Sequence, residues 1–417
     1  MRTSLDGSVL AGVFGRLSEV DTVRAARYPG DAGGRQPVHT CYVPADRVVG
    51  DLAGEWGAAA LAALDEHARG SSAFAGLLGL PGELAEMVHA KVVEKLRREP
   101  VEDLRIDFED GYGLRAGPDE DADAVRCAEL LAGWYRAGTA PPWAGLRFRS
   151  FDTKALAERG VRTLDLFVTA LGPPPPGFTL TFPKVTEVAQ VEVLVELLTL
   201  LEERLNLAEG TLRFEIQVET TQSIVDTEGR LALPRFIAAG AGRVSALHFG
   251  TYDYTAACGL SAAEQHLAHA ACDLARHVMQ VSAAGTGVRL SDGSTNILPV
   301  GDREAVHESW RTHYGLVLRS LAHGFYQGWD LHPAQLVTRY AANFVYYLQH
   351  APANAVRLRA YVDKADAGVL DEPATAQALA MSMRRALDCG ALDATDVRQL
   401  CGLSEVELDR LVRRESL

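Results

Sequence analysis

Acidic and basic side chains gather on this chain where short runs of alternating apolar and polar residues end. The stretch LRIDFEDGYG, residues 104–113, alternates in this way and then carries Glu109 and Asp110. Later runs end near the charged residues Arg147, Arg149, Lys184, Glu219 and Asp253. Carboxylates that converge beside cations are typical of a divalent cation site that also receives an anionic substrate. Because no histidines or cysteines cluster with them, the set favours Mg²⁺ over Zn²⁺.

The same charges have a second interpretation. A network of salt bridges on the rim of a protein uses the same residue types and holds no metal. Spacing along the chain does not decide between the two interpretations, so the choice depends on the elements that position the charges.

Segments in which apolar and polar residues alternate, as in a strand, are separated by helix-length segments along most of the chain. We predict eight strands, at residues 38–43, 104–109, 146–150, 178–184, 213–220, 246–253, 287–291 and 329–332. This order predicts an α/β fold, a (β/α)₈ TIM barrel in residues 1–337, followed by an α-helical C-terminal extension in residues 338–417. Active sites of such barrels lie at the C-terminal ends of the strands, which is where the charges fall.

One side of each strand in a parallel barrel faces the lumen, and the other side faces the helices. The alternation in LRFEIQVET then places four polar side chains inside, namely Arg213, Glu215, Gln217 and Glu219. The second strand likewise turns Arg105 and Asp107 inward. We expect the deeper charges to form structural ion pairs, these being Arg105, Asp107, Arg213 and Glu215. Charges at the strand ends are the candidates for function.

Composition and charge limit the partners of the chain. Of its 417 residues, 47% are hydrophobic and 23% are charged, as in an ordinary soluble globular enzyme. The formal net charge of −14 would repel a phosphate backbone, which argues against nucleic acid as a partner. The sequence has no apolar run of about eighteen residues and no signal-like N-terminal stretch, so we expect a cytoplasmic protein without membrane contact.

Six motifs, taken in order, resemble those of the HpcH/HpaI aldolase and citrate lyase beta-subunit family, which is related to malate synthase. They are LRIDFEDGYG, LRFRSFD, TFPKV, QVETTQSI, HFGTYDYT and GWDLHPAQ, and the resemblance covers about residues 38–371. The resemblance implies that Glu219 and Asp253 are Mg²⁺ ligands. It places Glu109 and Asp110 against the water shell of the metal.

The same resemblance gives roles to the basic residues. Arg147 stands where the family binds a substrate carboxylate or enolate oxygen. Arg149 replaces the asparagine that follows in the family, so the choice between the two arginines stays open. Lys184, in TFPKV, matches a Pro-Lys pair on the fourth strand of the family and is expected to bind substrate.

The family makes or breaks a carbon–carbon bond next to a carbonyl group through an enolate. The resemblance therefore implies a Mg²⁺-dependent carbon–carbon lyase or condensing enzyme that acts on a small 2-oxo or hydroxy acid or on its CoA thioester. A CoA-independent pyruvate aldolase and a non-catalytic barrel with a binding or assembly role are the alternatives. The expected partners are a small anionic substrate, with acyl-CoA left open, and further copies of the chain in a trimer or hexamer.

A segment beyond the barrel completes the resemblance. LDEP matches the IDxP segment of the CoA-lyase branch, in which the aspartate moves a proton at the reacting carbon, commonly from a neighbouring subunit. Asp371 is the matching residue and is expected to be catalytic. Aspartate is also a favoured helix cap and Pro373 suits the first turn of a helix, so capping is the alternative role.

Overall fold

The centre of this computed structural model, which describes residues 4–31, 33–364 and 372–415, is an eight-stranded sheet. All neighbouring strands are parallel, in the order β7-β6-β5-β4-β3-β2-β1-β8. A further parallel bridge joins Ser291 to Gln327 and nearly closes the sheet into a barrel. The strands are β1 (His39–Pro44), β2 (Asp103–Asp107), β3 (Trp143–Arg147), β4 (Phe178–Phe182), β5 (Phe214–Val218), β6 (Val244–Phe249), β7 (Arg289–Ser291) and β8 (Gly328–Asp330). The predicted (β/α)₈ barrel is confirmed, and each strand overlaps its prediction.

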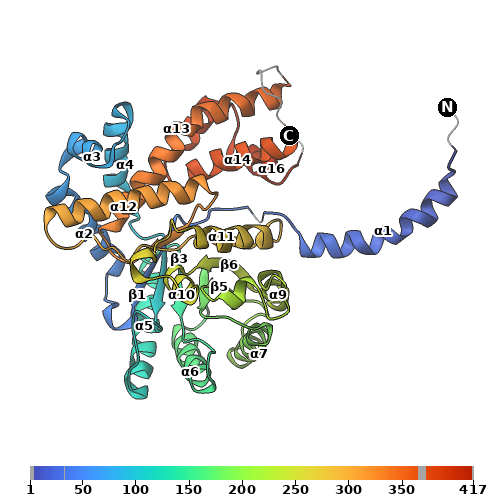
Figure 1. Cartoon of the computed structure of the whole chain (residues 1–417), viewed down its shortest axis with the longest axis horizontal. Coiled ribbons are helices and arrows are strands. Elements are labelled where there is room, and N and C mark those ends of the chain that lie inside the picture. The colour runs from blue at the N-terminus through green and yellow to red at the C-terminus, as the bar shows by residue number, and fades with distance from the viewer. Residues whose placement is uncertain (1–3, 32, 365–371, 416–417) are drawn as a thin grey trace.

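Helices surround the sheet and connect its strands (Figure 1). The longer ones are α2 (Leu52–His67), α3 (Gly70–Leu78), α4 (Ala85–Arg98), α5 (Gly117–Ala137), α6 (Lys154–Leu171), α7 (Val188–Leu205), α11 (Ala270–Ala283) and α12 (Arg303–Ala322). Short helices follow β5 and β6, and these are α8 (Thr221–Ile224), α9 (Leu233–Ala239) and α10 (Thr251–Ala257). Apolar side chains of the strands and helices form one continuous core between the two layers.

Strand β2 ends at Asp107, two residues before the predicted end at Glu109. The Asp107 carboxylate accepts hydrogen bonds from the N–H groups of Glu109, at 2.9 Å, and of Gly111, at 2.8 Å. A Cβ at position 111 would lie 2.6 Å from Asp107 Oδ2, so the turn needs a glycine there. Glu109 and Asp110 consequently lie in a turn above the strand.

Strand β6 also ends early, at Phe249, and Asp253 lies in the first turn of α10 instead of in the strand. Gly250 makes this change of direction next to Glu219. A Cβ at position 250 would lie 2.5 Å from the Cβ of Glu219, which again requires a glycine. The close approach brings the end of β6 against the end of β5.

The interior of the barrel is polar, as the alternation predicts. Arg105 donates to both carboxylate oxygens of Glu215, at 3.0 and 2.8 Å, and both side chains are buried. Nε2 of His248 lies 3.1 Å from the same carboxylate. The prediction is wrong for Arg213, which is exposed because it precedes Phe214, the first residue of β5, at the open N-terminal end of the barrel.

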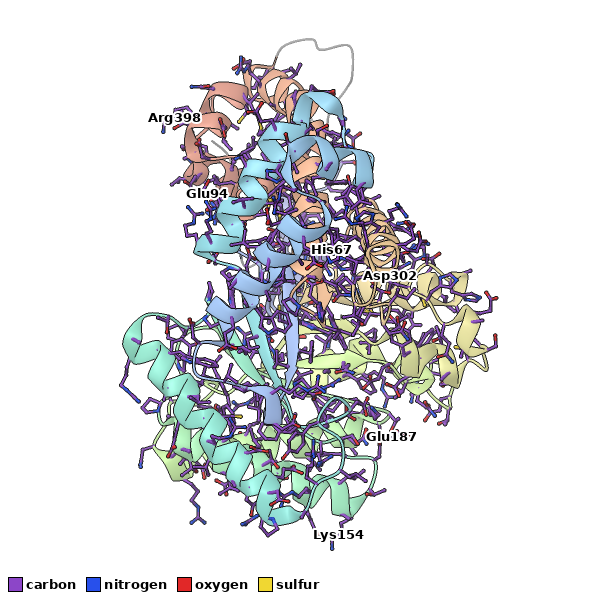
Figure 2. The ribbon with its side chains drawn as sticks, turned by 90° about the vertical axis from the view of Figure 1, so that its left-hand side faces the viewer. His67, Glu94, Lys154, Glu187, Asp302 and Arg398 are labelled. Carbon is purple, nitrogen blue, oxygen red and sulfur yellow. The ribbon has the colours of Figure 1, made fainter. Side chains whose placement is uncertain are left out.

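The C-terminal extension consists of α13 (Gln335–Asp363), α14 (Pro373–Asp388), α15 (Ala394–Cys401) and α16 (Glu405–Val412). In Figure 2, Lys154 and Glu187, at the starts of α6 and α7, lie toward one end of the molecule, whereas Glu94 and Arg398 lie toward the other end. Because α6 and α7 begin after β3 and β4, the first end is the one that the C-terminal ends of the strands face. The extension therefore lies away from the candidate residues.

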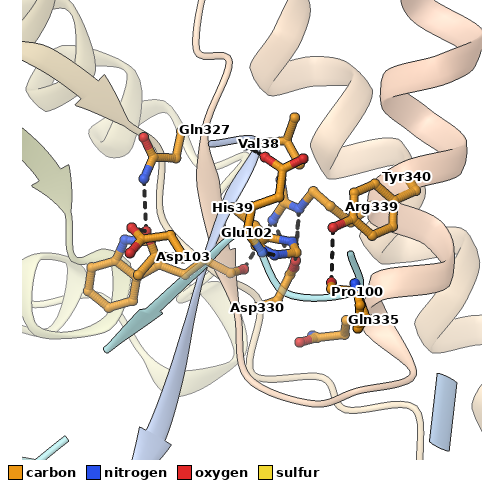
Figure 3. A network of polar contacts seen from close by, with 12 residues as sticks. Val38, His39, Pro100, Glu102, Asp103, Gln327, Asp330, Gln335, Arg339 and Tyr340 are labelled. Atoms are coloured by element: carbon orange, nitrogen blue, oxygen red, sulfur yellow. Dashed lines mark hydrogen bonds and ion pairs between the residues drawn. The ribbon is translucent and has the colours of Figure 1, made fainter. Parts of the chain in front are cut away.

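A buried polar network joins the extension to the barrel (Figure 3). Asp330 of β8 forms an ion pair with Arg339 of α13, at 2.9 Å. The same carboxylate lies 3.0 Å from Nδ1 of His39 and 3.1 Å from Nε2 of His313. Separation of α13 from the barrel would leave these buried groups without partners, which is costly. The predicted boundary between residues 337 and 338 lies near the start of α13 and stays a prediction.

Helix α1 (Gly7–Arg27) extends away from the rest of the molecule, and none of its residues is buried (Figure 1). Among the described residues, every helix is too short or too polar to cross a lipid bilayer.

Candidate functional site

Lys184 lies at the centre of the charged residues at the strand ends. Its Nζ atom is 2.7 Å from Glu109 Oε1, 2.7 Å from Asp110 Oδ2 and 3.7 Å from Asp253 Oδ2. Its backbone N–H donates to Glu219 Oε1 at 2.8 Å. The structure thus brings together these five residues, which were singled out from the sequence and come from the ends of four different strands.

The backbone of Lys184 adopts a left-handed conformation, with φ of 52°. Residues other than glycine rarely adopt it, and they keep it only where the surroundings hold them. Here the hydrogen bond from the Lys184 N–H to Glu219 keeps the backbone of Lys184 in this conformation. Burial opposes the charge of the ammonium, but Glu219 and Glu109 outweigh this effect and raise the pKa of Lys184. The lysine is therefore a fixed positive charge.

Glu219 is the most enclosed carboxylate of the group, with 1% of its surface exposed. The Gln217 side-chain amide donates to one of its oxygens. Burial, reinforced by Glu109 and Asp253 and only partly offset by Lys184, raises the pKa of Glu219 from 4.5 to about 8. The shift follows mainly from burial, and a cation bound beside this carboxyl group would favour loss of its proton.

Arg147, at the end of β3, lies beside this group with its charge already engaged. Asp107 binds its Nε and Nη2 atoms, and Nη1 donates to Gln217 Oε1 at 3.2 Å. Nη1 also lies 3.5 Å from Glu109 Oε2, and the guanidinium carbon is 5.0 Å from the centre of the Tyr42 ring. Although burial opposes the charge, Asp107 and Glu109 hold the pKa of Arg147 well above its usual value.

Arg149 lies in a different set of contacts. Its Nε donates to Glu120 Oε2 at 2.9 Å, and its Nη2 donates to the same oxygen at 2.6 Å and to the Gly113 carbonyl at 2.8 Å. Glu120 belongs to helix α5 and also accepts from Thr163 of α6. The guanidinium of Arg149 thus ties β3 to the outer helices, while that of Arg147 faces the carboxylates around Lys184.

The carboxylate oxygens of the site are ligands of the kind that Mg²⁺ prefers, but they are arranged as an ion-pair cluster around Lys184. In residues 4–31, 33–364 and 372–415, no three His, Cys, Asp or Glu side chains are grouped so that they could hold a metal ion. The carboxylates around Lys184 nevertheless offer only oxygen ligands, which Mg²⁺ prefers. A divalent cation at their centre would require the Lys184 ammonium to leave Glu109 and Asp110.

Several contacts of the site were not singled out from the sequence. Asp107 and Gln217 were placed inside the barrel but received no functional role, and the alternation in the first strand could also have turned Tyr42 inward. No local signal connects Arg149 with Glu120, which lies 29 residues earlier on a helix. Asp371, the predicted proton-transfer residue, lies outside the described residues.

Comparisons with known proteins give a family and a set of similar folds. The family described as "Domain of unknown function (DUF6986)" matches residues 17–416. No curated protein is matched by sequence.

Solved structures with a similar fold share little sequence with the chain. The lead(II) complex of Haloferax volcanii malate synthase is 17% identical over 63% of this chain and 70% of that one, with a TM-score of 0.47. The magnesium/glyoxylate complex of the same enzyme is 16% identical over 91% and 98%, with a TM-score of 0.47. The M. tuberculosis citrate lyase beta subunit complexed with oxaloacetate and magnesium is 18% identical over 75% and 97%, with a TM-score of 0.42. Sequence identities and TM-scores as low as these do not assign an activity to this chain.

Proposed function

The chain belongs to the DUF6986 family, and we propose that it is a Mg²⁺-dependent carbon–carbon lyase or condensing enzyme. Its substrate is a small 2-oxo or hydroxy acid, or the CoA thioester of such an acid, and the reaction passes through an enolate. The surplus of carboxylates around Lys184 is the observation that supports this proposal most. The six motifs that resemble the citrate lyase beta-subunit family, in the same order along the barrel, support it independently.

The charge balance of the site favours a further cation. Four carboxylates surround the single ammonium of Lys184, and these belong to Glu109, Asp110, Glu219 and Asp253. Arg147 does not remove the surplus, because Asp107 already balances its charge. A divalent cation held by Glu219 and Asp253 would remove most of it. Bound there, Mg²⁺ would stabilise negative charge that develops on a substrate oxygen.

Arg147 is the residue that we propose to bind the substrate. Asp107 fixes the plane of its guanidinium through Nε and Nη2, so Nη1 remains oriented toward Glu109 and the mouth of the barrel. A carboxylate or carbonyl oxygen of the substrate would accept a charge-assisted hydrogen bond from Nη1. Because the guanidinium is held in advance, little reorganisation is needed when charge develops.

Proton exchange at carbon tests the enolate chemistry without knowledge of the second substrate. The purified chain is incubated in D₂O with pyruvate, and in a separate sample with acetyl-CoA, in the presence of Mg²⁺ or EDTA. We expect loss of the methyl proton signal in the NMR spectrum in at least one Mg²⁺ sample, because an enolate takes up deuterium from solvent when it collapses. The exchange should stop in EDTA.

The result also separates the alternatives. The chain could exchange protons with pyruvate only and also release pyruvate from 4-hydroxy-2-oxo acids without CoA. This result would favour the pyruvate aldolase over the proposed function. Absence of exchange with both compounds, in a protein that binds Mg²⁺, would favour the non-catalytic barrel. An Arg147→Gln protein serves as the control for contaminating activities.

A further inference from the structure

A polar cavity of about 650 Å³ lies where β7 begins, at the N-terminal end of the barrel. Three parts of the chain enclose it. These are residues 29–31 before β1, residues 283–290 at the end of α11 and the start of β7, and residues 412–415 together with side chains of α14. Because all eight strands are parallel, this cavity is on the other side of the barrel from Lys184. It is therefore separate from the candidate active site.

The lining of this cavity is positively charged in a chain that is negative overall. Four arginines line it, namely Arg289, Arg385, Arg413 and Arg414. The acidic residues of the lining are Asp31 and Glu415. Against a formal net charge of −14 for the whole chain, this local excess of two positive charges favours an anion in the cavity.

Arg289 is the first residue of β7, and its charge has no acidic partner within ion-pair distance among the described residues. Its Nη2 donates to the backbone carbonyls of Gly33, at 3.1 Å, and Gly34, at 3.5 Å. Burial lowers the pKa of Arg289, Arg213 adds to this effect, and Asp31 and Asp388 offset it only in part. A partly buried guanidinium that is bound only by carbonyl groups keeps an uncompensated charge.

Arg385, on α14, is the second arginine of the lining without a carboxylate partner in the described part of the chain. Its guanidinium carbon lies 5.3 Å from the centre of the Tyr326 ring, a contact that orients the group but does not neutralise it. Of the other two arginines, Arg413 forms an ion pair with Glu415 at 2.8 Å, whereas Arg414 donates to the side-chain oxygen of Gln377 at 2.7 Å, which leaves its charge uncompensated within the described residues.

We propose that this cavity binds a small dianion of the phosphate-ester or dicarboxylate class between Arg289 and Arg385. Its volume lies within the range of about 300–1,000 Å³ that is usual for small-molecule sites. Guanidinium groups bind phosphate and carboxylate oxygens in two-pronged geometry, and two of them suit two negative charges. The bound anion joins the N-terminal segment, the barrel and the C-terminal helices, so it stabilises their mutual arrangement.

Isothermal titration calorimetry of the full chain in EDTA tests this site, with inorganic phosphate, inorganic pyrophosphate and malonate as probes at constant ionic strength. We expect saturable binding of at least one probe, and the preferred probe distinguishes the phosphate from the dicarboxylate class. Arg289→Gln and Arg385→Gln should each weaken this binding by about tenfold or more, since each removes a charged two-pronged contact.

Two matched variants control for the loss of a positive charge elsewhere. Arg162→Gln removes an exposed arginine that is paired with Asp121, and Arg311→Gln removes an exposed arginine that is paired with Glu308. Both should bind the probe as the wild type does. Unchanged binding in the Arg289→Gln/Arg385→Gln double variant, or no saturable binding of any probe to the wild type, would overturn the proposal. If Arg289→Gln does not fold, Arg385→Gln decides the result.

Discussion

Asp107 holds the guanidinium of Arg147 with both carboxylate oxygens, at 2.7 Å from Oδ1 to Nε and 2.7 Å from Oδ2 to Nη2. The same two oxygens accept the backbone N–H groups of Glu109 and Gly111. One buried side chain therefore fixes the orientation of the arginine and the turn that carries Glu109 and Asp110. The basic and the acidic parts of the site are positioned by a single residue.

Arg147→Lys should lower the rate of Mg²⁺-dependent proton exchange by about 10²–10³-fold, as loss of a pre-oriented charged donor does in other enzymes. Lysine cannot keep both contacts with Asp107 and also present a donor to the substrate. Arg149→Lys is the matched control, because it breaks the contacts with Glu120 and should reduce thermal stability more than the exchange rate. The reverse pattern would transfer the substrate-binding role to Arg149.

Glu219→Gln and Asp253→Asn should each abolish most of the Mg²⁺ affinity while the barrel stays folded. An amide keeps the size of the side chain but loses the negative charge that a hard cation requires. Titration calorimetry with Mg²⁺ measures the affinity, and circular dichroism checks the fold. Glu129→Gln, which alters helix α5 and not the site, is the control for a change of net charge. Wild-type affinity in both site variants would exclude these two residues as ligands.

In the absence of divalent cations, the stability of the protein should fall as the pH rises from about 4.5 to about 8. The pKa of Glu219 is about 8 in the folded chain, whereas a glutamate in the unfolded chain has its ordinary value of 4.5. Between these values the folded state holds a proton that the unfolded state has lost, so stability falls by up to about 1.4 kcal/mol per pH unit from this group. Urea unfolding in EDTA at several pH values measures the slope. Glu219→Gln should lack this component, and an unchanged slope in the variant would assign the dependence to other groups.

Lys184→Met should strengthen Mg²⁺ binding by about tenfold and still reduce the exchange rate. The ammonium and the metal use the same carboxylates, so removal of the charged hydrogen bonds to Glu109 and Asp110 frees them for the cation. Calorimetry gives the affinity and NMR gives the rate. Weaker Mg²⁺ binding in the variant would mean that the lysine organises the metal ligands and does not compete with the metal.

The alternation of residue types sufficed to predict the eight strands and most of the lumen, because burial on the two sides of a barrel strand has a period of two. It did not predict where strands end. The end of β2 is set by hydrogen bonds of Asp107, and the end of β6 by the close approach of Gly250 to Glu219. Both depend on contacts between strands, which a periodic pattern does not contain.

The two arginines at and just after the end of β3 illustrate a second limit of the sequence. Arg147 and Arg149 have the same parity on the predicted strand at residues 146–150, so alternation alone places both on the same side of the sheet. Arg149 lies beyond the last residue of β3, where the chain is free to turn its side chain toward α5 and Glu120. Strand parity applies only while the strand continues, so it could not separate the two residues.

Asp371→Asn should fold and bind Mg²⁺ normally yet lower the rate by about 10²–10⁴-fold, the usual contribution of a proton-transfer residue. The capping alternative predicts instead a loss of stability of about 1 kcal/mol with normal activity.

The N-cap residue of α14 is Glu372, and Pro373 lies in the first turn of this helix. The capping position is therefore taken by the residue that follows Asp371 in the sequence. If Asp371 acts on the site of a neighbouring subunit, mixed oligomers of Asp371→Asn and Glu219→Gln chains should regain part of the activity, because some sites then combine an intact metal ligand with an intact aspartate. A fully active Asp371→Asn enzyme would remove this residue from the mechanism and favour the CoA-independent aldolase.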